Sequence, residues 1–532
     1  MEPLRLATIH SRALVGAQAI PVAVEVHLGN GLPQFQIVGL PDTEVRESRE
    51  RVRVALQASG FEFPQRRITV NLAPADLPKR SGHFDLPMAL GLLLASGQLP
   101  PQRAVGLECA GELALDGRLR PVRGALAMAG AVASGGQKLL LPADHAPILC
   151  AFGFTHTFVA STLAMVGEWM KGERPDLALR PVAPADPGPE SLDLQFSKSD
   201  GTLIPDLADV RGQQQARHAL EVAAAGGHSL VLHGPPGCGK TLLAERLPGL
   251  LPDLTPAEAL ACAVQRSLAG LPIDLPRRHL RPFRRPHHTT PVKAMIGGGH
   301  PLRPGEVTLA HHGVLLLDEL PEFSRPSLEA LREPLQSGEV HVSRVYASAR
   351  YPARFQLVAT MNPCPCGRSG AMVPPCACTP ARIRAYRARL SQPLLDRIDL
   401  WVPLLPLADA SDRAHPGGVS PASAPASAPV STSASAPEST ATVRVRVLQA
   451  RARQAARQGC LNAHLDAGAL RHTLGQAPDL AAAWERCEQG LHLSARGAIR
   501  LLAVARTLAD LAGQEAVAVD DLYQAAGWRR MF

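Results

Sequence analysis

Short apolar runs alternate with helical patterns in the middle of the chain. Uninterrupted apolar runs cover residues 229–232, 314–317 and 355–360, and segments with helical spacing of apolar residues lie between them. Uninterrupted runs are typical of strands buried on both faces, and their alternation with helices is typical of a parallel sheet that is covered by helices. The pattern therefore predicts an α/β domain from about residue 204 to 405.

The pattern changes on either side of this domain. Residues 1–170 alternate short apolar runs with Gly/Pro turns and predict a separate α+β domain, followed by a linker over 171–203 that is rich in Pro, Asp and Ser. Residues 406–441 consist mainly of Pro, Ser, Ala and Thr, and we expect a disordered linker because they bury too little apolar area to offset the entropy of ordering. Residues 442–532 are rich in Ala, Leu and Arg and predict a helical domain.

The composition narrows the class of protein. A chain of 532 residues is long enough for two or three domains with their own cores. The first residues lack the pattern of a signal peptide, and apolar stretches such as residues 88–95 fall well short of the ~20 residues that span a bilayer. We therefore expect a cytoplasmic protein with no membrane partner. The net charge of +8 permits nucleic-acid binding without requiring it.

A glycine-rich segment directly after the first apolar run fits the pattern G-x-x-x-x-G-K-[ST]. In this pattern backbone N–H groups surround the β-phosphate, the lysine reaches the β- and γ-phosphates, and the hydroxyl binds Mg²⁺ at the start of a helix. The chain has only six lysines against 49 arginines, and yet a lysine stands here, where a compact ammonium fits better than a planar guanidinium. The predicted ATP-binding residues are Gly234, Pro235, Pro236, Gly237, Cys238, Gly239, Lys240 and Thr241.

Polar residues at the ends of the next two apolar runs complete a candidate hydrolysis site. Asp318 and Glu319 follow the second run, and Asn362 closely follows the third. Parallel α/β sheets bind their ligands at the carboxyl ends of the strands. We expect Asp318 to hold Mg²⁺ together with Thr241, Glu319 to act as general base, and Asn362 to orient the attacking water.

Two arginines further along the chain extend this set. Arg397 lies in Leu-Leu-Asp-Arg-Ile-Asp-Leu, and Arg496 lies in Ser-Ala-Arg-Gly within the Ala/Leu-rich region. The order of phosphate loop, acidic pair, Asn362, Arg397 and Arg496 resembles the Walker A, Walker B, sensor 1, arginine finger and sensor 2 of AAA+ ATPases. The resemblance implies a P-loop core with a helical lid, in which Arg397 reaches the γ-phosphate of a neighbouring subunit and Arg496 binds nucleotide.

Several further phrases are similar to the magnesium-chelatase-like branch of AAA+ proteins and its ComM-type (YifB) competence helicases. They lie at residues 38–42, 47–52, 84–87, 285–288, 311–314, 362–367 and 505–510. The likeness covers most of the chain except the stretch near 406–441. It implies a homohexameric, ATP-driven DNA helicase that acts on single-stranded and branched DNA and extends branch migration during natural transformation.

Two other functions stay open at this point. One is the ATPase subunit of a magnesium chelatase, which drives metal insertion into a porphyrin and is expected to lack the N-terminal domain. The other is a non-catalytic scaffold or protease regulator, against which the complete set of site residues argues.

The N-terminal domain contains a segment, residues 111–124, that resembles the strand-turn-strand before the catalytic lysine of Lon proteases. A Ser/Lys dyad needs a hydroxyl nucleophile and an amine of lowered pKa. The corresponding positions hold His83 and Leu126, while Ser81 and Lys79 are out of register. We therefore expect a Lon-like fold without proteolytic activity.

Four of the ten cysteines form two close pairs, Cys364 with Cys366 and Cys376 with Cys378. Disulfides are disfavoured in a reducing cytosol. Four thiolates from one loop can hold Zn²⁺ tetrahedrally and fix the connection after Asn362, although the spacing is C-x-C rather than the commoner C-x₂-C. Free thiols are the alternative.

Basic residues in two insertions between the core strands are candidates for DNA contact, because helicases of this class grip phosphates with loops that project into a pore. Lys293 and Arg303 lie in the insertion 289–306, and Arg344 lies in the insertion 338–355, which predicts a β-hairpin. As single residues such charges are more often solvated surface groups. The four arginines between 382 and 389 are a further candidate for contact with DNA or a neighbouring subunit.

Overall fold

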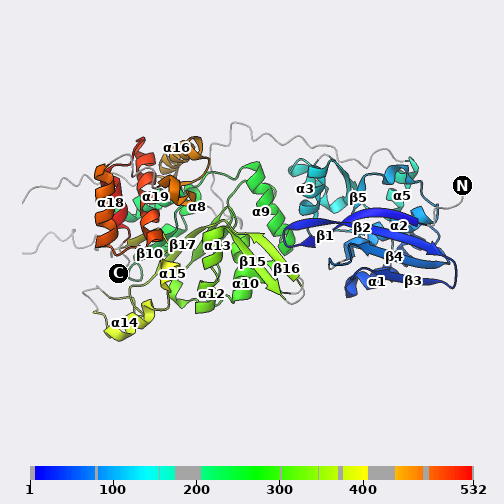
Figure 1. The fold of residues 1–532 in the computed structure, drawn as a ribbon, viewed down its shortest axis with the longest axis horizontal. Coiled ribbons are helices and arrows are strands. Elements are labelled where there is room, and N and C mark those ends of the chain that lie inside the picture. Colours follow the sequence, from blue (N-terminus) through cyan, green and yellow to red (C-terminus); the bar gives the residue numbers. More distant parts are fainter. Residues whose placement is uncertain are drawn as a thin grey trace, which may run out of the picture.

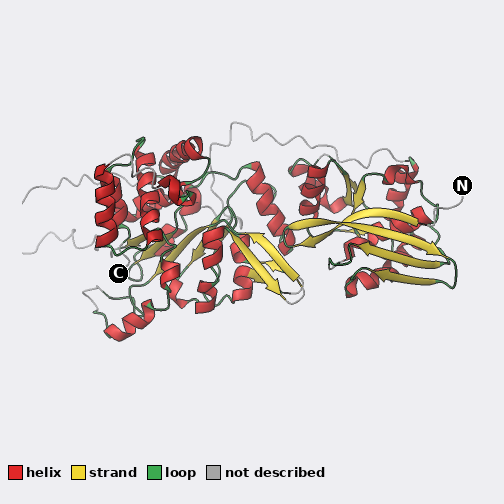
Figure 2. Ribbon diagram, viewed as in Figure 1, coloured by secondary structure: helices red, strands yellow, loops and turns green. Residues whose placement is uncertain are grey.

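The computed structural model describes residues 6–77, 79, 82–154, 156–173, 205–299, 302–344, 347–369, 375–404, 438–470 and 478–529. Figure 1 shows an elongated molecule with an N-terminal α/β part at one end, a second α/β part in the middle and the C-terminal helices at the other end. Figure 2 shows the strands of two large sheets and a separate hairpin. The predicted linkers 171–203 and 406–441 lie almost entirely outside the described residues.

The N-terminal part is built on a seven-stranded sheet of order β3-β4-β2-β1-β5-β8-β9. Its strands are β1 (Leu6–Val15), β2 (Gln18–Gly29), β3 (Gln34–Val38), β4 (Arg67–Ala73), β5 (Leu107–Cys109), β8 (Lys138–Pro142) and β9 (Thr157–Ala160). β2 pairs antiparallel with β1 and β4, and the remaining pairs are parallel. A small ribbon of β6 (Glu112–Leu113) and β7 (Leu119–Arg120) lies in the segment 111–124.

Helices cover this sheet. They are α1 (Thr43–Ala58), α2 (Asp85–Ala95), α3 (Ala125–Gly135), α4 (Ala146–Ala151) and α5 (Leu163–Lys171). Every residue of α2 is buried, which follows from its almost entirely apolar sequence. Gly91 lets this helix approach β2 closely, since a Cβ built there would lie 2.5 Å from the side chain of Val26.

The middle part is built on a five-stranded parallel sheet of order β11-β14-β17-β10-β18. Its strands are β11 (Phe283–Arg284), β14 (Val314–Leu317), β17 (Gln356–Met361), β10 (Leu230–His233) and β18 (Leu400–Pro403). Three of them, β10, β14 and β17, coincide within one residue at each end with the apolar runs of the sequence. The predicted α/β core with a parallel sheet is therefore confirmed.

The helices of this part are short, except for α6 (Gln214–Gly226) and α9 (Pro256–Ala269). The others are α7 (Lys240–Ala244), α8 (Leu247–Leu250), α10 (Val292–Ile296), α11 (Glu306–Leu309), α12 (Arg325–Glu329), α13 (Arg332–Ser337), α14 (Pro380–Arg387) and α15 (Gln392–Leu395). The predicted hairpin is present as β15 (Glu339–Arg344) and β16 (Ala347–Pro352), and a smaller ribbon joins β12 (Gly297–Gly298) to β13 (Arg303–Pro304).

The described C-terminal residues form α16 (Thr440–Gln458), α18 (Pro478–Gly490), α19 (Ala495–Ala512) and α20 (Val519–Gly527). One cluster of buried apolar side chains joins them to the core, because Val447 of α16 and Leu501 of α19 share it with Leu220 of α6 and Leu230 of β10. These helices therefore pack on the same face of the parallel sheet as α6.

The N-terminal part contacts the middle part at α9 and at the β15–β16 hairpin. Ala263 of α9 belongs to the apolar cluster that surrounds α3. At the turn between β1 and β2, a Cβ built on Gly16 would lie 3.0 Å from the Cβ of Ala349 in β16. Figure 1 shows this end of β1 beside the β15–β16 hairpin, so the N-terminal part packs against the side of the hairpin.

Candidate nucleotide site

The glycine-rich loop after β10 folds as a phosphate-binding loop. Gly237 and Gly239 have φ values of 79° and 89°, a region that favours glycine, and α7 begins at Lys240 directly after them. A Cβ built on Gly234 would lie 2.5 Å from the carbonyl oxygen of Leu404, so only glycine fits there. The positions of the glycines thus allow the tight loop between strand β10 and helix α7.

Lys240 is held inside this loop by oxygen acceptors. Its ammonium donates to the carbonyls of Gly234 at 2.8 Å and Pro235 at 2.7 Å, and to the side-chain oxygen of Asn362 at 3.0 Å. Burial lowers the pKa of Lys240. Phosphate oxygens are stronger acceptors than these neutral groups, so a bound nucleotide can take over the ammonium.

Thr241 and Asp318 meet at the same edge of the sheet. The Thr241 hydroxyl donates to Asp318 Oδ1 at 3.0 Å, and the Thr360 hydroxyl donates to the same oxygen at 2.5 Å. Burial acts to raise the pKa of Asp318, but these hydrogen bonds and the charge of Arg285 outweigh it and lower the pKa. A hydroxyl and an ionised carboxylate at this distance fit the oxygen ligands that Mg²⁺ prefers.

One charged neighbour of Asp318 was not predicted from the sequence as a site residue. Arg285 donates to Asp318 and, at 2.8 Å, to Glu245. It belongs to the phrase 285–288, which marked the family likeness without assigning a role. Its position could have indicated this contact, because Arg285 directly follows the edge strand β11 and therefore lies at the carboxyl end of the sheet.

Glu319 lies beside this pair in a strained backbone conformation. Its φ and ψ are 57° and 54°, a left-handed region that non-glycine residues seldom occupy, and its N–H donates to the Thr360 hydroxyl at 3.0 Å. Glu319 is exposed at the sheet edge. The structure therefore brings together Lys240, Thr241, Asp318 and Asn362, with Glu319 next to them.

Arg397 lies elsewhere, after α15 and beside a hollow of about 530 Å³ that α12, α13 and β15 also line. Its guanidinium donates to Gln336 Oε1 at 2.5 Å and to the carbonyl of Pro393 at 2.6 Å, while its Nε is buried without a hydrogen-bond partner among the described residues. Burial and the charges of Arg496 and Arg332 lower the pKa of Arg397. Arg496 is exposed in the first turn of α19. The charge of Arg496 acts on Arg397, and neither of these acceptors of Arg397 belongs to the phosphate-binding loop.

The four paired cysteines converge. The sulfur of Cys364 lies 3.4 Å from that of Cys366 and 3.7 Å from that of Cys376, and all four sulfurs, including that of Cys378, lie within 4.8 Å of one another. A tetrahedral ion with Zn–S bonds of ~2.3 Å needs sulfurs about 3.8 Å apart. The arrangement fits one metal ion bound by four thiolates.

Two backbone N–H groups point at these sulfurs. The N–H of Ser369 donates to Cys364 Sγ at 3.2 Å, and that of Cys378 donates to Cys376 Sγ at 3.4 Å. Such donors stabilise thiolate charge around a bound metal. The C-x-C spacing therefore does not prevent a closed site.

The described residues near the positions of a Lon Ser/Lys dyad are buried in the fold of the N-terminal part. His83 is buried and donates from Nε2 to the carbonyl of Arg12 at 2.8 Å, and burial lowers its pKa to about 4. Lys79 is buried and donates to the carbonyl of Pro74, and Leu126 is part of an apolar cluster. Ser81 lies outside the described residues.

The candidate DNA contacts occupy exposed insertions. Lys293 on α10 and Arg303 on β13 are exposed. Arg344 ends strand β15, and its side chain lies outside the described part of the structure. Arg350 on β16 is already paired with Glu339 at 2.7 Å.

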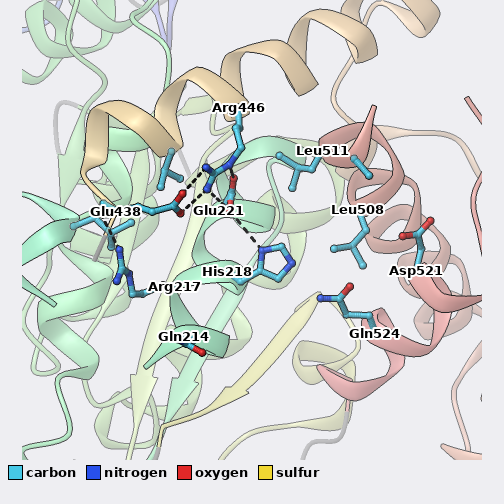
Figure 3. Close-up of a pocket in the computed structure, with 13 residues that line it drawn as sticks. Gln214, Arg217, His218, Glu221, Glu438, Arg446, Leu508, Leu511, Asp521 and Gln524 are labelled. Atoms are coloured by element: carbon cyan, nitrogen blue, oxygen red, sulfur yellow. Dashed lines mark hydrogen bonds and ion pairs between the residues drawn. The ribbon is translucent and has the colours of Figure 1, made fainter. Parts of the chain in front are cut away.

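A second cavity of about 540 Å³ lies where α6 meets the C-terminal helices. Arg446 of α16 pairs with Glu221 of α6 at 2.5 Å and with Glu438 at 2.8 Å. Figure 3 shows these three side chains turned toward one another. Leu508 and Leu511 of α19 supply apolar lining. The ion pairs tie the C-terminal helices to the core.

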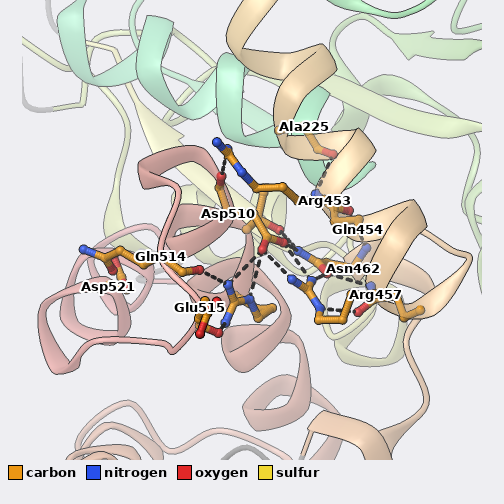
Figure 4. Close-up of polar contacts among 12 residues, drawn as sticks. Ala225, Arg453, Gln454, Arg457, Asn462, Asp510, Gln514, Glu515 and Asp521 are labelled. Atoms are coloured by element: carbon orange, nitrogen blue, oxygen red, sulfur yellow. Dashed lines mark hydrogen bonds and ion pairs between the residues drawn. The ribbon is translucent and has the colours of Figure 1, made fainter.

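The phrase 505–510, which carries part of the family likeness, contributes to a buried polar network. Asp510 accepts from Arg457 at 2.6 and 2.9 Å, from Arg506 at 2.8 and 3.2 Å, and from Asn462 at 2.8 Å. Figure 4 shows Asp510 of α19 facing Arg457 of α16 and Asn462. Burial acts to raise the pKa of Asp510, but these donors outweigh it and lower the pKa. This phrase therefore locks α16 against α19.

The parallel sheet, the phosphate-binding loop and Asp318 at one sheet edge define a protein with a phosphate-loop nucleotide-binding core. In agreement, sequence models of three families match the chain. Residues 206–411 match "Magnesium chelatase, subunit ChlI", residues 24–145 match "Subunit ChlI of Mg-chelatase", and residues 437–529 match "Magnesium chelatase, subunit ChlI C-terminal".

Proteins similar to this chain over its full length identify the family more narrowly. The chain is 43% identical to protein YifB of Escherichia coli, over 99% of this chain and 97% of that protein, and 42% identical to "Competence protein ComM" of Haemophilus influenzae, over 99% and 98%. The "Magnesium-chelatase 38 kDa subunit" of Cereibacter sphaeroides is 29% identical over only 29% of this chain and 51% of its own length. The chain belongs to the ComM/YifB-type family of magnesium-chelatase-like proteins, as the sequence phrases predicted.

In the described part of the chain, no helix is both long and apolar enough to cross a membrane.

Proposed function

We propose that the protein is an ATP-driven DNA helicase that promotes branch migration when incoming DNA is recombined during natural transformation. The observation that carries this proposal is the contact of Lys240 with Asn362 and of Thr241 with Asp318 at one sheet edge, in a chain similar to a competence protein over almost its full length. Contacts between motifs that lie far apart in the sequence support a complete hydrolysis site over a scaffold.

In this proposal the side chains at the sheet edge divide the chemistry. Backbone N–H groups of the loop from Gly234 to Gly239 and the Lys240 ammonium bind the phosphates of ATP. Thr241 and Asp318 hold Mg²⁺, which neutralises developing charge on the phosphates. Glu319 takes the proton of the attacking water, and Asn362 orients that water.

The site is completed by a neighbouring subunit in a homohexamer. The acceptors of Arg397, on Gln336 and Pro393, are neutral, so its charge is available to a γ-phosphate presented from outside. An arginine at that position stabilises charge in the transition state. We assign Arg397 to the site of the adjacent subunit and Arg496 to nucleotide binding.

The other parts of the chain have distinct roles in the proposed helicase. The N-terminal residues 1–170 form a non-proteolytic Lon-like domain, residues 204–405 form the ATPase core and residues 442–532 form a helical lid, with 171–203 and 406–441 as linkers. The buried environments of His83 and Lys79 support the absence of a Ser/Lys dyad. The protein acts in the cytoplasm and contacts single-stranded or branched DNA through Lys293, Arg303 and Arg344.

We further propose that Cys364, Cys366, Cys376 and Cys378 bind one structural Zn²⁺. The mutual approach of their sulfurs supports this assignment.

An ATPase assay with different effectors tests the function. Branched DNA should raise the hydrolysis rate more than single-stranded DNA, and protoporphyrin should leave it unchanged, with Glu319→Gln as the inactive control and Glu322→Gln as a matched exposed carboxylate. Stimulation by protoporphyrin alone would identify a chelatase subunit instead. Full-length similarity to a competence protein favours DNA, because the similarity to the chelatase 38 kDa subunit covers a minor share of the chain.

A further inference from the structure

The loop that carries the four cysteines also carries two residues that face the phosphate-binding loop. It runs from the end of β17 to the start of α14, and its first cysteine pair begins two residues after Asn362. Cys364 is fully buried, and the N–H of Gly367 donates to its carbonyl at 2.9 Å. The first pair therefore sits in a tight turn directly after a residue that contacts Lys240.

This turn is packed against the phosphate-binding loop. Gly367 has a φ of 77°, and a Cβ built on it would lie 2.7 Å from Cδ of Pro236. On the other side of the turn, Asn362 accepts from Lys240 at 3.0 Å. Two points of the same turn thus touch the loop that is proposed to bind the phosphates.

The second cysteine pair lies farther along the chain and contributes through sulfur contacts. Cys376 Sγ lies 3.5 Å from Cys366 Sγ and 3.7 Å from Cys364 Sγ. Without a bound cation, close-packed thiols contribute little to holding the two ends of the loop together. With one, they form a closed link whose binding free energy stabilises the turn.

We propose that the metal bound by these four cysteines is a positioning element of the nucleotide site: it fixes the turn from Asn362 to Gly367, and so holds Pro236 and Asn362 in place for hydrolysis. The inference rests on the proposed ATPase function and zinc site. The metal acts through the turn and does not touch the nucleotide. Its loss therefore misplaces Asn362 while the backbone N–H groups of the phosphate-binding loop still bind ATP.

The test uses the full-length protein and Cys376→Ser, because Cys376 is remote in sequence from Asn362. The wild type should contain about one zinc and no iron per chain, and its Co²⁺ form should show thiolate-to-metal charge-transfer bands. In Cys376→Ser the metal and these bands should be lost. We expect kcat to fall on the order of 10²-fold, as for a small misplacement of reacting groups, with the Kd of a fluorescent ATP analogue nearly unchanged.

Three further variants separate positioning from folding. Cys376→His can still ligate zinc and should keep both metal and most of kcat. Gly367→Ala keeps all four cysteines and should keep zinc, but it should lose kcat because its Cβ pushes on Pro236. Cys460→Ser, which removes a cysteine outside the cluster, should change neither.

Amide hydrogen exchange of the peptide with residues 234–241 gives a readout that does not depend on activity. Its exchange should accelerate in Cys376→Ser and Gly367→Ala and stay at the wild-type level in Cys460→Ser. A wild type without zinc, or a zinc-free Cys376→Ser with wild-type exchange and kcat, would overturn the inference. If the wild type holds zinc and the exchange changes as expected, but even the wild type does not hydrolyse ATP, the proposed function fails and the role of the metal in positioning the turn stands.

Discussion

Two groups of arginines in the second half of the chain differ in what they face. Arg457 and Arg506 are paired with the buried carboxylate of Asp510 at 2.6 and 2.8 Å. Arg397 instead donates to a neutral side chain and a backbone carbonyl, and the strongest charges acting on it are other arginines. An arginine that is matched within the chain stabilises the fold, whereas one held among like charges beside a hollow is available to an external anion.

The largest expected effect is on hydrolysis and comes from Arg397. In Arg397→Ala we expect the hydrolysis rate to fall by ~10³ to 10⁵, as for arginine fingers in other phosphate-loop enzymes, with ATP binding nearly unchanged. Steady-state ATPase assays and nucleotide titration measure this. Arg384→Ala, an exposed arginine on α14, is the matched control. Wild-type hydrolysis in Arg397→Ala combined with loss in Arg384→Ala would place the finger on α14.

Mixing two inactive variants tests whether Arg397 acts across a subunit interface. Lys240→Ala should fail mainly at nucleotide binding and Arg397→Ala at hydrolysis. In mixed assemblies some sites combine an intact Lys240 with an intact Arg397 from the neighbour, so part of the activity should return. Co-assembly without recovery would contradict the assignment.

The Asp510 group should show the opposite behaviour, a loss of stability. Removing the carboxylate in Asp510→Ala leaves buried arginine charge uncompensated, which costs about 3–5 kcal/mol in the free energy of unfolding. Urea unfolding measures this. Asp116→Asn, which breaks an exposed pair with Arg118, should have a much smaller effect on that free energy, because solvent screens the two charges. Equal losses of stability in the two variants would remove the distinction between the arginine groups.

The contribution of Asp510 should also depend on pH. Because the folded-state pKa is lowered, its stabilisation is fully present above the ordinary pKa of about 3.9 and is lost as the pH falls through the folded-state value. The difference in unfolding free energy between wild type and Asp510→Asn should therefore be constant from pH 7 to about 5 and shrink below about 4. A difference that grows on acidification would contradict the ion-pair explanation.

The smallest expected effect concerns cations on the insertions. Lys293→Ala or Arg303→Ala should weaken DNA binding and reduce the slope of log affinity against log salt by roughly 0.7–0.9 for each phosphate that is no longer neutralised. Fluorescence anisotropy over a range of salt concentrations measures the slope. Lys138→Ala on β8 is the control. Unchanged slopes in both insertion variants would mean that other residues bind the DNA.

The elements that could be predicted from the sequence depend on the spacing of residues close together in the chain. The strands around β10, β14 and β17 and the hairpin β15–β16 follow from apolar runs and turn residues, and the phosphate-binding loop follows from its glycines and Lys240. The contacts of Asp318 with Arg285 and with the Thr360 hydroxyl were not predicted from the sequence. Arg285 follows β11 and Thr360 lies on β17, and both strands flank β14 only in the folded sheet. Strand order is not encoded in any local pattern.

The parallel core, the phosphate-binding loop and the family could be predicted from the sequence, because each depends on residues close together in the chain or on overall similarity. Which charged residues are paired with an opposite charge depends on the folded structure. It turned the phrase 505–510 into a packing network around Asp510, brought four thiols within 4.8 Å, and gave Arg397 the neutral acceptors of Gln336 and Pro393. The physical reason is that Coulomb energy and burial depend on distance in space, which chain folding sets over separations of up to hundreds of residues.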